Sequence, residues 1–168
     1  MKIDLMEVLK NEGEKKTFLI SREIEDDIVE FFGEKIKAVQ PIKVNGYVIN
    51  YEGKIHLQMN IKTRIQRICS RCLNPYNEEI DVDANYVFTK DLQNANGDLK
   101  TYSGNAIDIK DIVLDEITSQ MSMKPLCNEN CKGLCSACGN NKNLTDCPCV
   151  TEEIDERLEV LRNLLEKE

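Results

Sequence analysis

The chain has 168 residues, a net charge of −8, eight cysteines and no tryptophan. A chain of this length can bury about 70% of the surface that its unfolded form exposes, so one domain with an aliphatic core is expected. The acidic balance argues against indiscriminate binding to nucleic-acid backbones. No apolar run approaches 18 residues, so the sequence predicts no membrane span.

The amino-terminal stretch MKIDLMEVLK lacks the apolar run and the cleavage site of a secretory signal. We therefore expect a cytoplasmic protein, in which thiols stay reduced and disulfides are disfavoured. The run KKTFLIS (15–21) predicts a short strand. Apolar residues then recur at helical spacing and predict a short helix, with Ile24, Ile28, Phe31 and Phe32 on one face.

An alternation with a period of two begins at Tyr47 and continues to Ile65, with apolar residues at odd positions and mostly polar residues at even positions. This pattern is typical of half-buried antiparallel strands, and it places Tyr47, Ile49 and Tyr51 on the buried face. Glu52-Gly53 can supply a hairpin turn. The apolar residues before Tyr47 are out of phase with the run, so a bulge is expected at Asn45-Gly46.

A further strand is predicted at 78–89, where the apolar residues occupy even positions. The segment CSRCLNPY (69–76) lies between the two alternating runs and is expected to form a turn that presents two cysteines. The polar segment 91–106 is rich in Asn and Gly and predicts a loop.

Two helices are predicted after this loop. Asp108 can cap the first, whose apolar face comprises Ile109, Ile112, Val113, Ile117 and Met121. Thr151 can cap the second, whose apolar face comprises Ile154, Leu158, Leu161 and Leu165. We expect an α+β core domain at 1–126, a cysteine-rich metal-binding segment at 127–150 and a C-terminal helix at 151–168 that packs on the core. The predicted fold is an antiparallel β-sheet backed by two helices, with a cysteine-rich zinc-binding C-terminal segment.

The cysteines are the clearest chemical signal in the chain. They are Cys69, Cys72, Cys127, Cys131, Cys135, Cys138, Cys147 and Cys149. A tetrahedral zinc site takes four thiolates, usually from two closely spaced pairs, because one tight turn can present both sulfurs to one ion. Eight cysteines therefore predict two zinc ions.

Spacing favours one partition of the eight cysteines. The pair at 135 and 138 and the pair at 147 and 149 are eight residues apart, so one small loop can bring them together. Gly139 permits the positive φ that such a turn often needs. The pair at 69 and 72 then joins the pair at 127 and 131. An alternative grouping takes the four cysteines that are nearest in sequence, from 127 to 138, and leaves the other two pairs without a common site.

Other readings of the cysteines remain open. An iron–sulfur cluster also uses thiolates, and a CxxC pair can be a redox motif or a disulfide, although the expected βαβ context is absent. A metal held by four thiolates has no open position for water, so the sites are expected to be structural. No phosphate-binding loop and no nucleophile elbow occurs, and His56 lies on a polar strand face. We therefore expect neither an enzyme nor a small-molecule substrate.

A basic region precedes and includes the first cysteine pair: residues 41–75 carry six Lys or Arg against one Glu. The candidate nucleic-acid-binding residues are Lys54, Lys62, Arg64, Arg67 and Arg71. The competing interpretation is cross-strand ion pairing. If Ile65 faces Ile80, then Arg64 faces Asp81 and Lys62 faces Asp83.

Several motifs together resemble one known family. They are ICSRCLNPY (68–76), IDIKDIVLDEI (107–117), KPLCNENCKGLCSACGNN (124–141), the CPC motif and DERLEVLRNLL (155–165). This pattern, over roughly residues 40–166, resembles the YceD family of large ribosomal RNA subunit accumulation proteins. The resemblance implies metal binding by the eight cysteines and a role in 23S rRNA accumulation. The partner would be large-subunit rRNA or, since the chain is acidic, a basic ribosomal protein.

Overall fold

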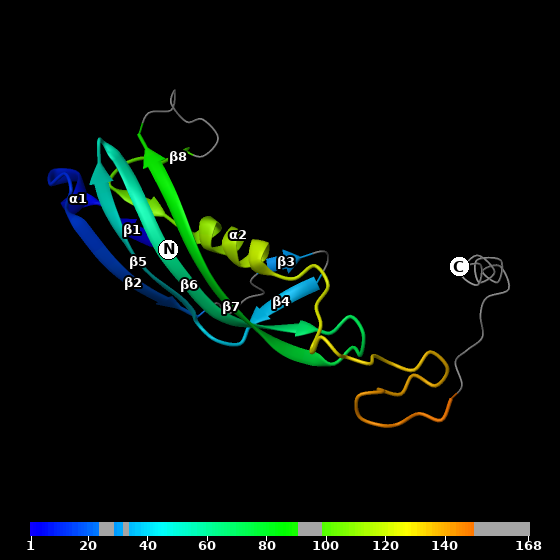
Figure 1. The fold of residues 1–168 in the computed structure, drawn as a ribbon. Helices are drawn as coiled ribbons and strands as arrows, with labels where there is room; N and C mark the ends of the chain where they lie inside the picture. The colour runs from blue at the N-terminus through cyan, green and yellow to red at the C-terminus, as the bar shows by residue number, and fades with distance from the viewer. Residues whose placement is uncertain (24–28, 32–33, 91–98, 150–168) are drawn as a thin grey trace, which may run out of the picture.

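The computed structural model describes residues 1–23, 29–31, 34–90 and 99–149. These residues form a curled β-sheet with two helices, and the cysteine-rich segment follows at one end of the sheet (Figure 1). The expected fold class is therefore confirmed. One of the two helices, the short α1 (Met6–Lys10), was not expected from the sequence. No helix in the described part of the chain is long and apolar enough to cross a membrane.

The centre of the sheet is built from four antiparallel neighbours in the order β2, β5, β6, β7. Their bounds are β2 (Lys15–Arg22), β5 (Ile42–Tyr51), β6 (Lys54–Ile68) and β7 (Pro75–Thr89). The sheet is extended at its margins by β8 (Leu99–Thr101), parallel to β7, and by β4 (Glu34–Ala38), which also pairs with β3 (Val29–Phe31). A separate two-stranded sheet consists of β1 (Lys2–Asp4) and β9 (Ala106–Asp108).

The core lies on one face of the sheet, under α2 (Lys110–Gln120) and α1 (Figure 1). The odd positions of β6 from Ile55 to Arg67 and the even positions Ile80, Ala84 and Phe88 of β7 are buried there. Helix α2 contributes Ile112, Val113 and Ile117, as its apolar spacing predicts. It begins one residue later than expected, because Ile109 occupies the cap position while the Asp108 carboxylate accepts a hydrogen bond from the Lys110 N–H.

Strand β5 presents the face opposite to the predicted one. Its buried residues are at even positions, including Val44 and Val48, so Tyr47 and Tyr51 lie on the outer face of the sheet. The reason is the two-residue turn at Glu52-Gly53, in which both residues have positive φ. Partners across such a hairpin have opposite parity, as in the pair Val48 and Leu57, and partners share a face.

The predicted bulge at Asn45-Gly46 is also wrong. The register between β5 and β6 is unbroken from Lys43 opposite Lys62 to Tyr51 opposite Lys54. Gly46 has another role there, because a Cβ atom at this position would lie 2.1 Å from the backbone carbonyl oxygen of Gln58. Glycine thus allows an unusually close approach of β5 to β6.

Three other predictions fall on less regular parts of the chain. The predicted helix around Phe31 is wrong where it is described, because 29–31 forms β3, and backbone pairing with β4 overrides the local periodicity. The predicted loop at 91–106 contains β8 and the first residue of β9. The remaining residues of both segments, 24–28, 32–33 and 91–98, and the predicted C-terminal helix at 151–168 lie outside the described residues.

Candidate metal centres

The first cysteine cluster joins the β6–β7 turn to the segment after α2. It contains Cys69 and Cys72 from the turn and Cys127 and Cys131 from the segment, with all four sulfurs within 4.8 Å of one another. The Cys69 and Cys131 sulfurs are 3.9 Å apart, and those of Cys72 and Cys127 are 3.6 Å apart. Four metal–sulfur bonds of about 2.3 Å in a tetrahedron require sulfurs about 3.8 Å apart. The cluster therefore fits one tetrahedrally coordinated metal ion.

The turn that carries Cys69 and Cys72 is closed by its own backbone. The N–H of Leu73 donates to the carbonyl of Cys69 over 2.9 Å, and the N–H of Cys69 donates to the carbonyl of Asn74 over 2.9 Å. Leu73 has a φ of 59°, in the left-handed region that only a tight turn imposes on such a residue. The two sulfurs consequently project to the same side, as the sequence predicts for a metal knuckle.

Hydrogen bonds that need no metal also fasten the cysteine-rich segment to this turn. The guanidinium of Arg71 donates to the carbonyl oxygens of Glu129 and Cys131 over 3.2 and 2.9 Å. In return, the carbonyl of Arg71 accepts from the N–H of Leu134 over 3.1 Å. Gly133 has a φ of 73°, and a Cβ there would lie 3.1 Å from the same carbonyl oxygen, so this crossing favours glycine.

The second cluster is local in the chain. It contains Cys135, Cys138, Cys147 and Cys149, whose sulfurs also lie within 4.8 Å of one another. The sulfur of Cys147 is 3.3 Å from that of Cys138 and 3.4 Å from that of Cys135, closer than in the first cluster. Gly139 has a φ of 73°, and its N–H closes a turn on the Cys135 carbonyl over 2.9 Å. The two clusters have the grouping that cysteine spacing favours.

Each cluster contains at least one thiol that backbone donors favour as the thiolate, the form that binds metal. Burial opposes ionisation of Cys69, but backbone N–H groups of its neighbours outweigh it and lower the pKa of Cys69 to about 6. In the second cluster, backbone N–H groups of Cys138 and Ala137 lower the pKa of Cys135 to about 6. Such N–H···S donors are what a tetrathiolate metal centre requires to offset its negative charge.

Asn143 connects the two clusters, and sequence reasoning missed it. It lies in the loop of the second cluster, yet its side-chain amide donates to the Cys131 sulfur of the first over 3.3 Å. Its carbonyl oxygen accepts from the Lys132 N–H over 2.8 Å. Asparagine is common in turns, so the sequence alone gives no reason to expect that this one contacts a cysteine of the first cluster.

Two of the five candidate nucleic-acid-binding residues, Arg67 and Arg71, donate hydrogen bonds to backbone carbonyls of the segment that follows α2. Arg67 is 2% exposed, and its guanidinium donates to the Glu78 carboxylate over 3.2 Å and to the Ser122 carbonyl over 2.8 Å. Arg71 holds the cysteine-rich segment as described above. Both arginines therefore join the β6–β7 end of the sheet to the chain that follows α2.

Lys62 and Arg64 lie on the outer face and form ion pairs, but with partners other than those expected. Lys62 contacts Asp81 over 2.9 Å, and Arg64 contacts Glu79. The register places Ile65 opposite Glu78 instead of Ile80, so each partner lies two residues earlier in β7 than predicted. Charge pairing survives this offset because acidic residues occupy alternate positions of β7 on the same face. Lys54 is exposed beside the β5–β6 turn.

Together, the fold and the clusters define a β-sheet protein with two tetrathiolate sets that could hold metal ions at one end of the sheet. The family model described as "Large ribosomal RNA subunit accumulation protein YceD" matches residues 57–165, which include all eight cysteines. The chain belongs to this family, as the sequence motifs indicate, and its family thereby links it to large-subunit ribosomal RNA.

Two curated relatives have the same description. A protein from Zea mays, named "Large ribosomal RNA subunit accumulation protein YCED homolog 1, chloroplastic", is 28% identical over 65% of this chain and 48% of its own length. The Arabidopsis thaliana protein of the same name is 25% identical over 76% of this chain and 49% of its own length. The chain thus spans about half the length of these relatives. No solved structure matches it.

Proposed function

We propose that this protein is a non-enzymatic, zinc-binding cytoplasmic factor that supports 23S rRNA accumulation and large-subunit assembly. The observation that carries the proposal is the pair of tetrathiolate clusters inside the segment that matches the family. The first cluster would fix the β6–β7 turn to the segment after α2, and the second would order that segment itself. Zinc supplies a closed, redox-inert tetrahedral centre, so its contribution here is structural.

Direct contact with rRNA is proposed through the outer face of the sheet. Lys54, Lys62 and Arg64 lie on this face, whereas the buried Arg67 and the engaged Arg71 would support it indirectly. The ion pairs of Lys62 and Arg64 are solvent-exposed, and such pairs exchange readily with phosphate partners.

A second candidate is an adaptor or chaperone for a basic ribosomal protein. It is favoured by the net charge of −8 and by the row of carboxylates at Glu79, Asp81 and Asp83 on β7. A thiol redox protein is the third candidate, since no described cysteine is in a disulfide. Stoichiometric zinc with unreactive thiols would eliminate it.

Deletion of the gene, followed by measurement of 23S relative to 16S rRNA, tests the proposed role. A selective loss of 23S rRNA that the unmodified protein restores is expected, and unchanged 23S rRNA would contradict it. Crosslinking in cells, followed by recovery with and without nuclease, separates the two partner classes. If nuclease removes the crosslinked partner, direct contact with RNA is supported. If a crosslinked ribosomal protein is still recovered after nuclease treatment, the adaptor is supported.

A further inference from the structure

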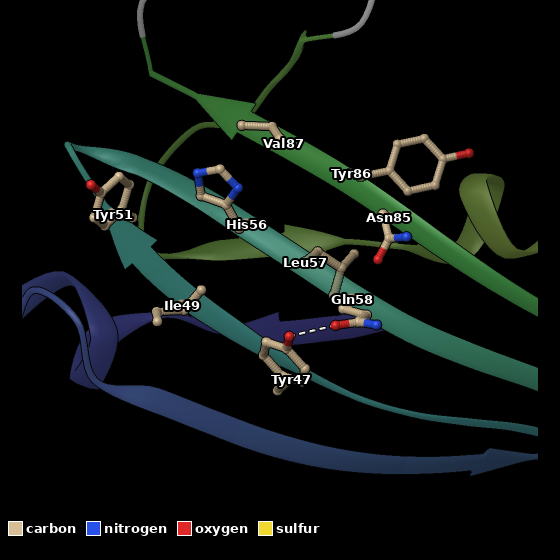
Figure 2. Close-up of a pocket in the computed structure, with 9 residues that line it drawn as sticks. All are labelled: Tyr47, Ile49, Tyr51, His56, Leu57, Gln58, Asn85, Tyr86 and Val87. Atoms are coloured by element: carbon tan, nitrogen blue, oxygen red, sulfur yellow. Dashed lines mark hydrogen bonds between the residues drawn. The ribbon is translucent and has the colours of Figure 1, made fainter.

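A groove of about 400 Å³ lies over the outer face of the sheet, and no cysteine is among the residues that line it (Figure 2). It crosses the central strands near the β5–β6 turn. Its lining consists of Tyr47, Ile49, Tyr51, His56, Leu57, Gln58, Asn85, Tyr86 and Val87. No described helix packs on this face, because α1 and α2 both lie on the core side.

The groove presents aromatic rings to solvent. Tyr51 is 57% exposed, and its ring meets the His56 ring edge-on with centroids 6.3 Å apart. The hydroxyl of Tyr47 donates to the side-chain carbonyl of Gln58, which fixes both side chains across β5 and β6 (Figure 2). The Tyr47 ring is thus held in place by a hydrogen bond, while the Tyr51 ring on the same strand is exposed to solvent.

Two amide side chains lie within the groove, and two lysines lie beside it. Gln58 and Asn85 offer donors and acceptors within it, and the nine lining residues include no carboxylate. Lys15 lies at one margin, with its ammonium 3.4 Å from the Tyr47 ring centre, and Lys54 lies directly opposite Tyr51. The carboxylates of Asp81 and Asp83 begin further along the sheet, where both accept hydrogen bonds from Asn60.

We propose that this groove binds an unpaired base of single-stranded RNA. The base would stack on Tyr51 beside His56, the next nucleotide would meet the amides of Gln58 and Asn85 further along β6 and β7, and the phosphates would lie toward Lys54 and Lys15. Exposed aromatics on a sheet, flanked by cations, are a general means of holding unpaired bases. The volume lies in the range of sites for ligands of this size. The inference rests on the proposed rRNA contact and places that contact at one site.

The test uses the 168-residue chain, loaded with zinc, and a short fluorescein-labelled single strand copied from large-subunit rRNA, titrated at several salt concentrations. Tyr51→Leu, which keeps apolar bulk but removes the ring, should weaken binding about tenfold without changing the salt slope. Tyr51→Phe keeps the ring and should bind as the unmodified protein does. Lys54→Gln should lower the slope of log affinity against log salt by about 0.7. The same strand in a duplex should bind more weakly.

Each outcome decides the inference. Because the chain has no tryptophan, tyrosine emission should fall when the single strand binds and should respond less in Tyr51→Leu. If RNA binds but Tyr51→Leu retains full affinity, the groove is not the site, although direct rRNA contact stands. If the unmodified protein binds neither strand, the groove inference fails, while the 23S rRNA measurement still tests the proposed function through a protein partner. Equal melting temperatures of the three variants exclude misfolding as the cause.

Discussion

Asn143 donates its side-chain amide to the sulfur of Cys131 over 3.3 Å, and this contact joins the loop of the second cysteine cluster to a ligand of the first. The same loop is tied back by the N–H of Lys142, which donates to the Gly133 carbonyl over 2.9 Å. Ordering the second cluster therefore places a hydrogen-bond donor on the first. The two metal sites are expected to be energetically coupled.

Asn143→Ala should lower the zinc affinity of the first cluster about tenfold to a hundredfold, as loss of a hydrogen bond to a metal ligand commonly does. Competition with a chromophoric chelator measures the affinity of each site. The control is Asn140→Ala, which changes an exposed side chain in the same loop. Equal zinc affinities in the two variants would show that the contact carries no coupling.

The protein should contain about two zinc ions per chain, one for each cluster. Elemental analysis of protein purified without added metal measures the content, and thiol titration measures the number of reactive cysteines. Removal of zinc should expose the thiols to the reagent and lower the melting temperature, because metal binding is linked to folding. A metal-free preparation with eight reactive thiols and unchanged melting would refute the zinc centres.

The clusters should differ in their effect on the whole domain. Cys72→Ser breaks the cluster that links the β6–β7 turn to residues 127 and 131, so it should lower the melting temperature of the entire protein. Cys147→Ser breaks a cluster confined to 135–149, so amide exchange should accelerate mainly at 132–149. The two variants serve as controls for each other. Equal global destabilisation would mean that both clusters support the core.

Arg67 and Arg64 lie three residues apart on opposite faces of β6, so their substitutions should have different effects. Arg67→Gln should destabilise the protein by about 3 kcal/mol, because it removes the buried cation of this ion pair and leaves the partly buried Glu78 carboxylate with no charged partner. Arg64→Gln, at an exposed pair, should change the free energy of unfolding by less than about 1 kcal/mol. Urea unfolding monitored by circular dichroism measures both. A small effect of Arg67→Gln would argue against its structural role.

Gly46→Ala should destabilise the sheet by about 2 kcal/mol, because its Cβ would overlap the carbonyl oxygen of Gln58 and force β5 away from β6. Asn45→Ala, at the exposed neighbouring position, provides the control. Thermal unfolding of the two variants measures the difference. If Gly46→Ala melts as the control does, the close strand approach is not required.

The sequence by itself determined the features whose signal lies within a short stretch of chain. The alternation in β6 and β7 fixed their buried faces, since side chains of a strand point alternately to its two sides. The apolar spacing of α2 fixed its packing face. Cysteine spacing predicted the two groupings, because sulfurs two to four residues apart can reach one ion only through a tight local turn.

Tertiary structure alone decided what depends on how separate segments meet. The pairing of β5 with β6 decided which face of β5 is buried and placed Tyr47 and Tyr51 on the outside. The register of β6 against β7 moved each ion pair by two residues, since several acidic positions of β7 could satisfy Lys62 and Arg64. The role of Arg67 depends on its contact with Ser122, which is distant in sequence. The role of Asn143 depends on its contact with Cys131, which belongs to the other cysteine cluster. A charged or polar side chain does not encode whether it will be exposed or buried, because burial depends on the surfaces that fold over it.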